Sequence, residues 1–133
     1  MTGYEGDLTP QEAWDFLAAT PNAVLVDVRM PGEWQAVGIP DLAELGRDVA
    51  LNTLQTPAGP NPSFLDDLRE AGLEPGDDRP VVFLCKSGGR SLAAARIATA
   101  AGFGPAYNVL EGYEGHAEAG WFEAGLPAKR WEA

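Results

Sequence analysis

The chain's single cysteine, Cys85, lies in a segment whose residue types suit nucleophilic chemistry. This segment runs from Cys85 to Ser91 as Cys-Lys-Ser-Gly-Gly-Arg-Ser, and it follows the apolar run Val81–Leu84. Gly88 and Gly89 allow the backbone to curl with positive φ and turn its N–H groups inward, which makes a cradle for an anion. A thiol in such a cradle is favoured as the thiolate, which is its nucleophilic form. A lone cysteine after a strand can also be a passive core residue, but the glycines and cations favour a catalytic Cys85.

The residues after the cysteine are candidate binding groups for an anionic substrate. Lys86 and Arg90 bring positive charge, and a guanidinium offers donors in one plane. Ser91 can hydrogen-bond within the loop or cap the helix that follows it. The net charge of the chain is −11, yet no acidic residue occurs between Val81 and Gly104. We therefore expect the substrate to be bound by Lys86, Ser87, Gly88, Gly89, Arg90 and Ser91.

The composition fits one globular domain and narrows the choice of partners. The chain has 133 residues, of which 45% are hydrophobic and 22% charged, and domains commonly contain about 100–150 residues. The net charge of −11 argues against nucleic acid and against an anionic membrane surface as partners. A single cysteine allows no intrachain disulfide, and the first ten residues carry no Lys or Arg, so we expect a cytoplasmic protein. We expect neither a metal nor another cofactor.

Strand and helix patterns alternate along the chain. The sequence Thr9-Pro10-Gln11-Glu12 is typical of a capping box that opens a helix. Apolar runs without alternation predict strands that are covered on both faces, at 23–28, 81–84 and 106–110. Helical patterns occupy 10–19, 64–71 and 91–101. We expect a turn at 30–34, and a long loop at 38–62 in which 48–54 could form a short strand. This order predicts a single α/β domain over 1–133, with its core at about 8–127 and a mostly parallel central sheet flanked by helices.

Polar residues near the end of the first predicted strand are expected to support the site rather than react. Asp27 and Arg29 follow a buried strand, so we predict an ion pair or hydrogen-bond network that fixes the neighbouring loops. Glu33 belongs with them, and we expect it to pair with Arg29. His116, the only histidine, could act as a general base. A thiolate activated by its loop needs no base, so we leave His116 outside the site.

Four segments together resemble one protein family. They are Cys85–Ser91, Leu25–Arg29 followed by Glu33-Trp34, Ala106–Gly115 and Gly120–Pro127. These segments resemble parts of the rhodanese family. The first resembles its active-site loop, and the second resembles its first core strand with the acidic and aromatic pair that follows. The third resembles its late strand with a glycine turn, and the fourth its terminal helix region. The resemblance is to single-domain members and covers about 8–127. It implies a three-layer fold and a sulfurtransferase.

The implied reaction moves a sulfane sulfur from a donor such as thiosulfate to a thiophilic acceptor, cyanide or a thiol, through a persulfide on Cys85. The partners would be a small sulfur-containing anion and a thiol, and a protein could also serve as donor or acceptor. Because the chain has no second cysteine to form an internal disulfide, the acceptor must be another molecule.

Two other functions stay open. The domain could be a sulfur-relay module that carries a persulfide between proteins and turns over small donors poorly. It could also be a phosphatase or an arsenate reductase on the same scaffold. The related phosphatases resemble Cys-x5-Arg, a loop one residue longer than the one between Cys85 and Arg90. The shorter loop favours sulfur over phosphate.

Overall fold

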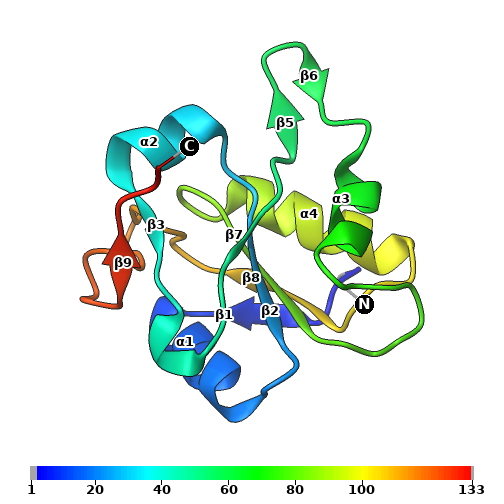
Figure 1. Cartoon of the computed structure of the whole chain (residues 1–133), viewed down its shortest axis with the longest axis horizontal. Helices are drawn as coiled ribbons and strands as arrows, with labels where there is room; N and C mark the ends of the chain where they lie inside the picture. Colours follow the sequence, from blue (N-terminus) through cyan, green and yellow to red (C-terminus); the bar gives the residue numbers. More distant parts are fainter. Residues whose placement is uncertain (1–2, 133) are drawn as a thin grey trace.

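The structure, a computed structural model, describes residues 3–132. Within them a five-stranded sheet has the order β1-β8-β7-β2-β4, and every neighbouring pair is parallel (Figure 1). Its strands are β1 (Gly6–Leu8), β2 (Val24–Asp27), β4 (Ala50–Leu51), β7 (Val81–Leu84) and β8 (Ala106–Val109). The predicted α/β class with a parallel central sheet is confirmed.

Helices cover both faces of this sheet. They are α1 (Pro10–Ala19), α2 (Pro31–Val37), α3 (Phe64–Glu70) and α4 (Gly89–Ala100) (Figure 1). Leu17 of α1 belongs to one core cluster with Leu25 of β2, whereas Val26 belongs to a second cluster with residues of α3 and α4. Successive side chains of a strand point to opposite faces. The apolar runs lack alternation because both faces of β2 and β7 are buried.

The start of α1 follows from its sequence. The backbone N–H of Glu12 donates to Thr9 Oγ1 at 3.1 Å, and the backbone N–H of Thr9 donates to Glu12 Oε1 at 2.9 Å. These two bonds form the reciprocal capping box that the sequence predicted.

Helix α2 replaces the turn expected at 30–34. Pro31 occupies the first helical turn, where its missing N–H costs nothing. The backbone N–H of Met30 donates to Glu33 Oε1 at 3.0 Å. Trp34 is buried, and its ring packs edge-on against Trp131 with centroids 5.3 Å apart. Tertiary burial of one aromatic ring thus stabilises a helix too short to form alone.

The loop expected at 38–62 contains several short elements. They are β3 (Ile39–Pro40), a 3-10 turn η1 (Ala43–Leu45), β4, and a hairpin of β5 (Gln55–Thr56) and β6 (Gly59–Pro60). The short strand expected at 48–54 is β4, which pairs with β2. Strand β3 pairs with β9 (Ala128–Lys129), which lies near the end of the chain.

The terminal helix that the resemblance implied for 120–127 is wrong. Residues 121–125 form turns. Trp121 is fully buried, and its indole N–H donates to the Pro127 carbonyl at 2.8 Å, which bends the chain back on itself. Gly125, with φ +80°, takes a conformation that would end a helix. None of the helices within residues 3–132 combines the length and apolarity that a membrane span requires.

Candidate active site

Cys85 directly follows β7, at the carboxyl end of the sheet where open α/β folds bind ligands. Its Sγ accepts a hydrogen bond from the backbone N–H of Gly88 at 3.1 Å, and the Ser91 hydroxyl lies 3.3 Å away. The N-terminus of α4 points at the same sulfur and adds a partial positive charge. The Gly88 N–H and the N-terminus of α4 suit an anionic sulfur. The Cys85 side chain is only 1% exposed, so a reactant must reach it through the exposed loop residues Lys86, Ser87 and Gly89.

The cysteine loop turns at one glycine rather than at two. Gly88 has φ +107°, whereas Gly89 is absent from the positive-φ residues and is the first residue of α4. Gly88 is also the N-cap of this helix. Ser91 therefore lies inside the first turn: of its two expected roles, hydrogen bonding within the loop is confirmed and capping of the helix is wrong. A glycine cap brings the N–H groups of the first turn close to Sγ without an intervening side chain.

Arg90 forms a bidentate ion pair with Glu33. The sequence had suggested instead that Glu33 pairs with Arg29. Arg90 Nη1 lies 2.6 Å from Glu33 Oε1, and Nη2 lies 2.8 Å from Oε2. The expected pairing of Glu33 with Arg29 is wrong, because the Arg29 guanidinium forms its ion pair with Asp27. The pair joins the first turn of α2 to that of α4 beside the cysteine. The hydrogen bonds that Arg90 donates to Glu33 raise the pKa of Arg90, so this cation keeps its charge near the sulfur.

The Glu33–Arg90 pair makes a pH-dependent contribution to stability. The hydrogen bond from Arg90, with that from the Met30 N–H, lowers the pKa of Glu33 below its ordinary 4.5. A lowered pKa stabilises the fold above the ordinary value and loses this effect as the pH falls through the lowered value. We expect Glu33→Gln to reduce the free energy of unfolding at pH 7 by at most about 1 kcal/mol, since the pair is partly solvated.

Urea unfolding of both proteins between pH 7 and pH 2 measures this difference. It should shrink steadily below pH 4.5. Glu70→Gln, at an exposed position, controls for the loss of one acidic group. A difference that stays constant with pH would contradict the assignment.

Asp27 and Arg29 form a fully buried ion pair at the end of β2, the strand next to β7. Arg29 Nη2 lies 2.7 Å from Asp27 Oδ2 and also donates to the Gly38 carbonyl at 2.9 Å. The guanidinium stacks on the ring of Tyr113, with Cζ 4.2 Å from the centroid. Its Nη1 has no hydrogen-bond partner among the described residues. The pair ties the end of β2 to the end of α2 and to the loop after β8.

That loop holds the backbone of the cysteine segment in place. The N–H of Tyr113 donates to the Cys85 carbonyl at 2.8 Å, and the N–H of Glu114 donates to the Lys86 carbonyl at 2.9 Å. Gly112, with φ +59°, passes so close that a Cβ would lie 2.4 Å from the Cys85 carbonyl oxygen. Only glycine fits there. In the sequence Gly112 belongs to a glycine turn, and no local pattern indicates that it lies against the cysteine loop.

Two further polar residues, Asn108 and Asp7, are linked to the site by hydrogen bonds, although the sequence did not indicate them. The Ser91 hydroxyl lies 2.5 Å from Asn108 Oδ1, and Asn108 Nδ2 donates to Asp7 Oδ1 at 3.1 Å. Asn108 is 3% exposed in the middle of β8. The one available signal was an amide inside an apolar strand, which needs hydrogen-bond partners when buried. His116 is exposed, and its backbone N–H donates to Glu111 Oε1 at 3.2 Å.

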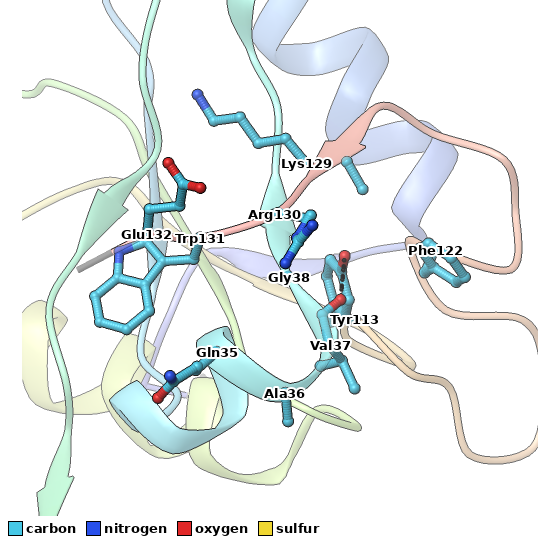
Figure 2. Close-up of a pocket in the computed structure, with 11 residues that line it drawn as sticks. Gln35, Ala36, Val37, Gly38, Tyr113, Phe122, Lys129, Arg130, Trp131 and Glu132 are labelled. Atoms are coloured by element: carbon cyan, nitrogen blue, oxygen red, sulfur yellow. Dashed lines mark hydrogen bonds between the residues drawn. The ribbon is translucent and has the colours of Figure 1, made fainter.

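A groove of about 620 Å³ lies between the end of α2, the loop after β8 and the last residues described (Figure 2). Its lining mixes apolar and charged side chains: the apolar ones include Val37, Tyr113, Phe122 and Trp131, and the charged ones are Lys129, Arg130 and Glu132. Phe122 is 60% exposed and Val37 42%. The Tyr113 hydroxyl donates to the Val37 carbonyl at 3.1 Å and closes one side of the groove (Figure 2). Through Tyr113 the groove adjoins the backbone of Cys85.

A family model described as the STR4 middle domain, which is rhodanese-like, matches residues 6–132. The chain belongs to the rhodanese-like family. Among rhodanese-like relatives, the thiosulfate sulfurtransferase GlpE of Pseudomonas syringae is 36% identical over 92 residues, which are 69% of this chain and 70% of that protein. An uncharacterised protein of Rickettsia prowazekii is 36% identical over 117 residues, covering 87% of this chain and 90% of its own length.

Solved structures with the rhodanese-like fold are similar to this chain. The crystal structure of Rv0390 from M. tuberculosis is 48% identical with a TM-score of 0.85, over 96% of this chain and 99% of that one. The polysulfide-sulfur transferase homodimer of Wolinella succinogenes is 29% identical with a TM-score of 0.71, over 94% of this chain and 78% of that one. These similarities support membership of a sulfurtransferase family.

Proposed function

We propose that this rhodanese-like domain is a sulfurtransferase that carries a sulfane sulfur as a persulfide on Cys85. The observation that carries the proposal is the setting of Sγ, which accepts the Gly88 N–H at 3.1 Å and faces the N-terminus of α4. Hydrogen bonds and helix dipoles of this kind stabilise both a thiolate and an anionic persulfide. The sulfurtransferase relatives support the same reaction class.

Sulfur transfer proceeds as two displacements. The Cys85 thiolate attacks the outer sulfur of thiosulfate; the S–S bond of thiosulfate breaks, and its electron pair leaves with sulfite. Cys85 is then a persulfide. An acceptor, cyanide or a thiolate, attacks the outer sulfur, and the Sγ–S electron pair returns to Cys85 as the thiolate. The exposed Lys86 attracts the donor anion, while Arg90 adds positive charge from the first turn of α4.

A sulfur-relay function is the second candidate, and the groove in Figure 2 favours it. Phe122 is exposed and lines the same groove as Lys129 and Arg130, and another protein can cover a surface of this kind. In that case a partner protein would load the persulfide directly. A phosphatase is disfavoured because the loop between Cys85 and Arg90 is one residue shorter than the Cys-x5-Arg loop of the related phosphatases.

A panel of donors and acceptors, read by the mass of the intact protein, tests these functions. With thiosulfate we expect a gain of about 32 Da on Cys85, one sulfur atom, and steady transfer to cyanide. Loading only by a cysteine desulfurase, with negligible thiosulfate turnover, would favour the relay. Hydrolysis of an aryl phosphate that depends on Cys85 would favour a phosphatase. Absence of the added sulfur with every donor would overturn sulfur transfer altogether.

A further inference from the structure

A chain of hydrogen bonds joins the edge strand β1 to the sulfur of Cys85. The Tyr4 hydroxyl donates to Asp7 Oδ1 at 2.8 Å, and the Asn108 amide donates to the same oxygen at 3.1 Å. Asn108 Oδ1 lies 2.5 Å from the Ser91 hydroxyl, which in turn lies 3.3 Å from Cys85 Sγ. Asp7 and Asn108 are register partners on adjacent parallel strands, so their side chains leave the same face of the sheet.

The direction of each bond follows from the carboxylate at the outer end. An ionised carboxylate only accepts, so the NH₂ of Asn108 must face Asp7 and its Oδ1 must face Ser91. The hydrogen bond to Asp7 raises the pKa of Tyr4, which keeps the phenol a donor. An amide oxygen also only accepts. Ser91 must therefore donate its proton to Asn108.

This direction affects the sulfur because a hydroxyl has a single proton. Ser91 lies within hydrogen-bond distance of two acceptors, Asn108 Oδ1 and Cys85 Sγ, and can donate to only one of them at a time. While it donates to Asn108, its oxygen presents a lone pair to Sγ. A lone pair suits a neutral thiol, which can donate its S–H. It does not suit a thiolate.

We infer that Asn108 is a positioning residue that holds the Ser91 proton away from Cys85 and so sets how readily the thiolate forms, with Asp7 fixing its orientation. The inference deepens the proposed function, since it concerns the same reacting sulfur. For Ser91 to donate to a Cys85 thiolate, its hydroxyl must rotate and abandon a 2.5 Å hydrogen bond. The network thus favours the neutral thiol and partly offsets the effect of the Gly88 N–H, which favours the thiolate.

Other charged groups also surround the sulfur, and the test must leave them intact. Lys86 lies on the same loop, and Arg90 of α4 is paired with Glu33 of α2. The Asp27–Arg29 pair lies at the end of β2, next to β7. A substitution at Asn108 changes none of these charges, so a changed titration of Cys85 would arise from the hydrogen-bond chain.

The test measures the rate of Cys85 alkylation by iodoacetamide against pH, which needs no sulfur donor. In Asn108→Leu, Ser91 is free to donate to the thiolate, and we expect the midpoint of the profile to fall by about one pH unit. Asp7→Asn, on the exposed edge strand, should lower it by less, because an amide at residue 7 no longer fixes the orientation of Asn108. Val109→Ala, a core change on the same strand, should leave the midpoint unchanged.

Each variant is also made with Ser91→Ala, because an effect that passes through Ser91 must disappear when the hydroxyl is absent. Equal shifts with and without Ser91, or no shift in either Asn108→Leu or Asp7→Asn, would overturn the inference. The experiments distinguish failure of the proposed sulfur transfer from failure of the role inferred for Asn108. Shifts as expected without any persulfide in the donor panel would refute sulfur transfer and leave the role of Asn108 standing.

Discussion

Replacing Cys85 with serine is expected to reduce transfer of sulfur from thiosulfate to cyanide by at least about 10³-fold. Serine keeps the size of the side chain and could still accept the Gly88 N–H. Its hydroxyl is not ionised at neutral pH and cannot form a persulfide. The chain contains no second cysteine to take over the reaction. Steady-state assays and intact mass after thiosulfate treatment measure the two parts of this loss.

A loss of activity in Cys85→Ser must be separated from a loss of structure, because the thiol lies in a core cluster with Phe83 and Ala94. Circular dichroism and the urea midpoint should show a folded protein. Wild-type protein alkylated with iodoacetamide provides an independent control, since it removes the nucleophile without changing the gene. Residual transfer within tenfold of wild type in either sample would contradict a Cys85 persulfide.

The largest change in stability is expected from Asp27→Asn, at about 3–5 kcal/mol of the free energy of unfolding. Asparagine has nearly the same shape, so no cavity forms. The substitution leaves the guanidinium of Arg29 without its carboxylate at a site that is 0% exposed. Its remaining partners are the Gly38 carbonyl, the face of Tyr113 and the neutral amide oxygen of the new asparagine, none of which carries a full negative charge. Guanidinium chloride unfolding at pH 7 measures the effect.

The matched control for Asp27→Asn is the double variant Asp27→Asn, Arg29→Met. It removes the uncompensated charge while retaining much of the side-chain volume, so it should recover most of the lost stability. Recovery will be incomplete because the Gly38 carbonyl loses its donor. A cost below about 1 kcal/mol for the single change, or a double variant less stable than the single one, would show that the buried charge is not what destabilises the protein.

The parts of the fold that could be predicted from sequence are those set by local patterns. The apolar runs that became β2 and β7 are long enough to be strands and lack alternation because helices cover both faces. The Thr9 capping box is readable because its partners lie three residues apart. The cysteine loop also has a local signature, in which glycine and cations follow the end of a strand.

The remaining features depend on contacts between distant residues. Glu33 and Arg90 are 57 residues apart, and no local pattern indicated that Glu33 would pair with Arg90 rather than Arg29. Pro31 and Gly32 suggest a turn, yet burial of Trp34 makes a helix of the segment. The Asn108–Asp7 bond spans 101 residues and depends on β1 lying beside β8. Such a neighbour cannot be identified before the strand order is known.

The position of Asp7 also bears on how this protein behaves at high concentration. β1 is one outer strand of the main sheet, and such strands leave backbone donors and acceptors open to pairing with a second molecule. β1 is only three residues long, and its central residue is an exposed carboxylate. A second copy of this edge would bring like charges together in an antiparallel pairing. Asp7, which orients Asn108, thus also disfavours edge-to-edge aggregation of the sheet through charge repulsion.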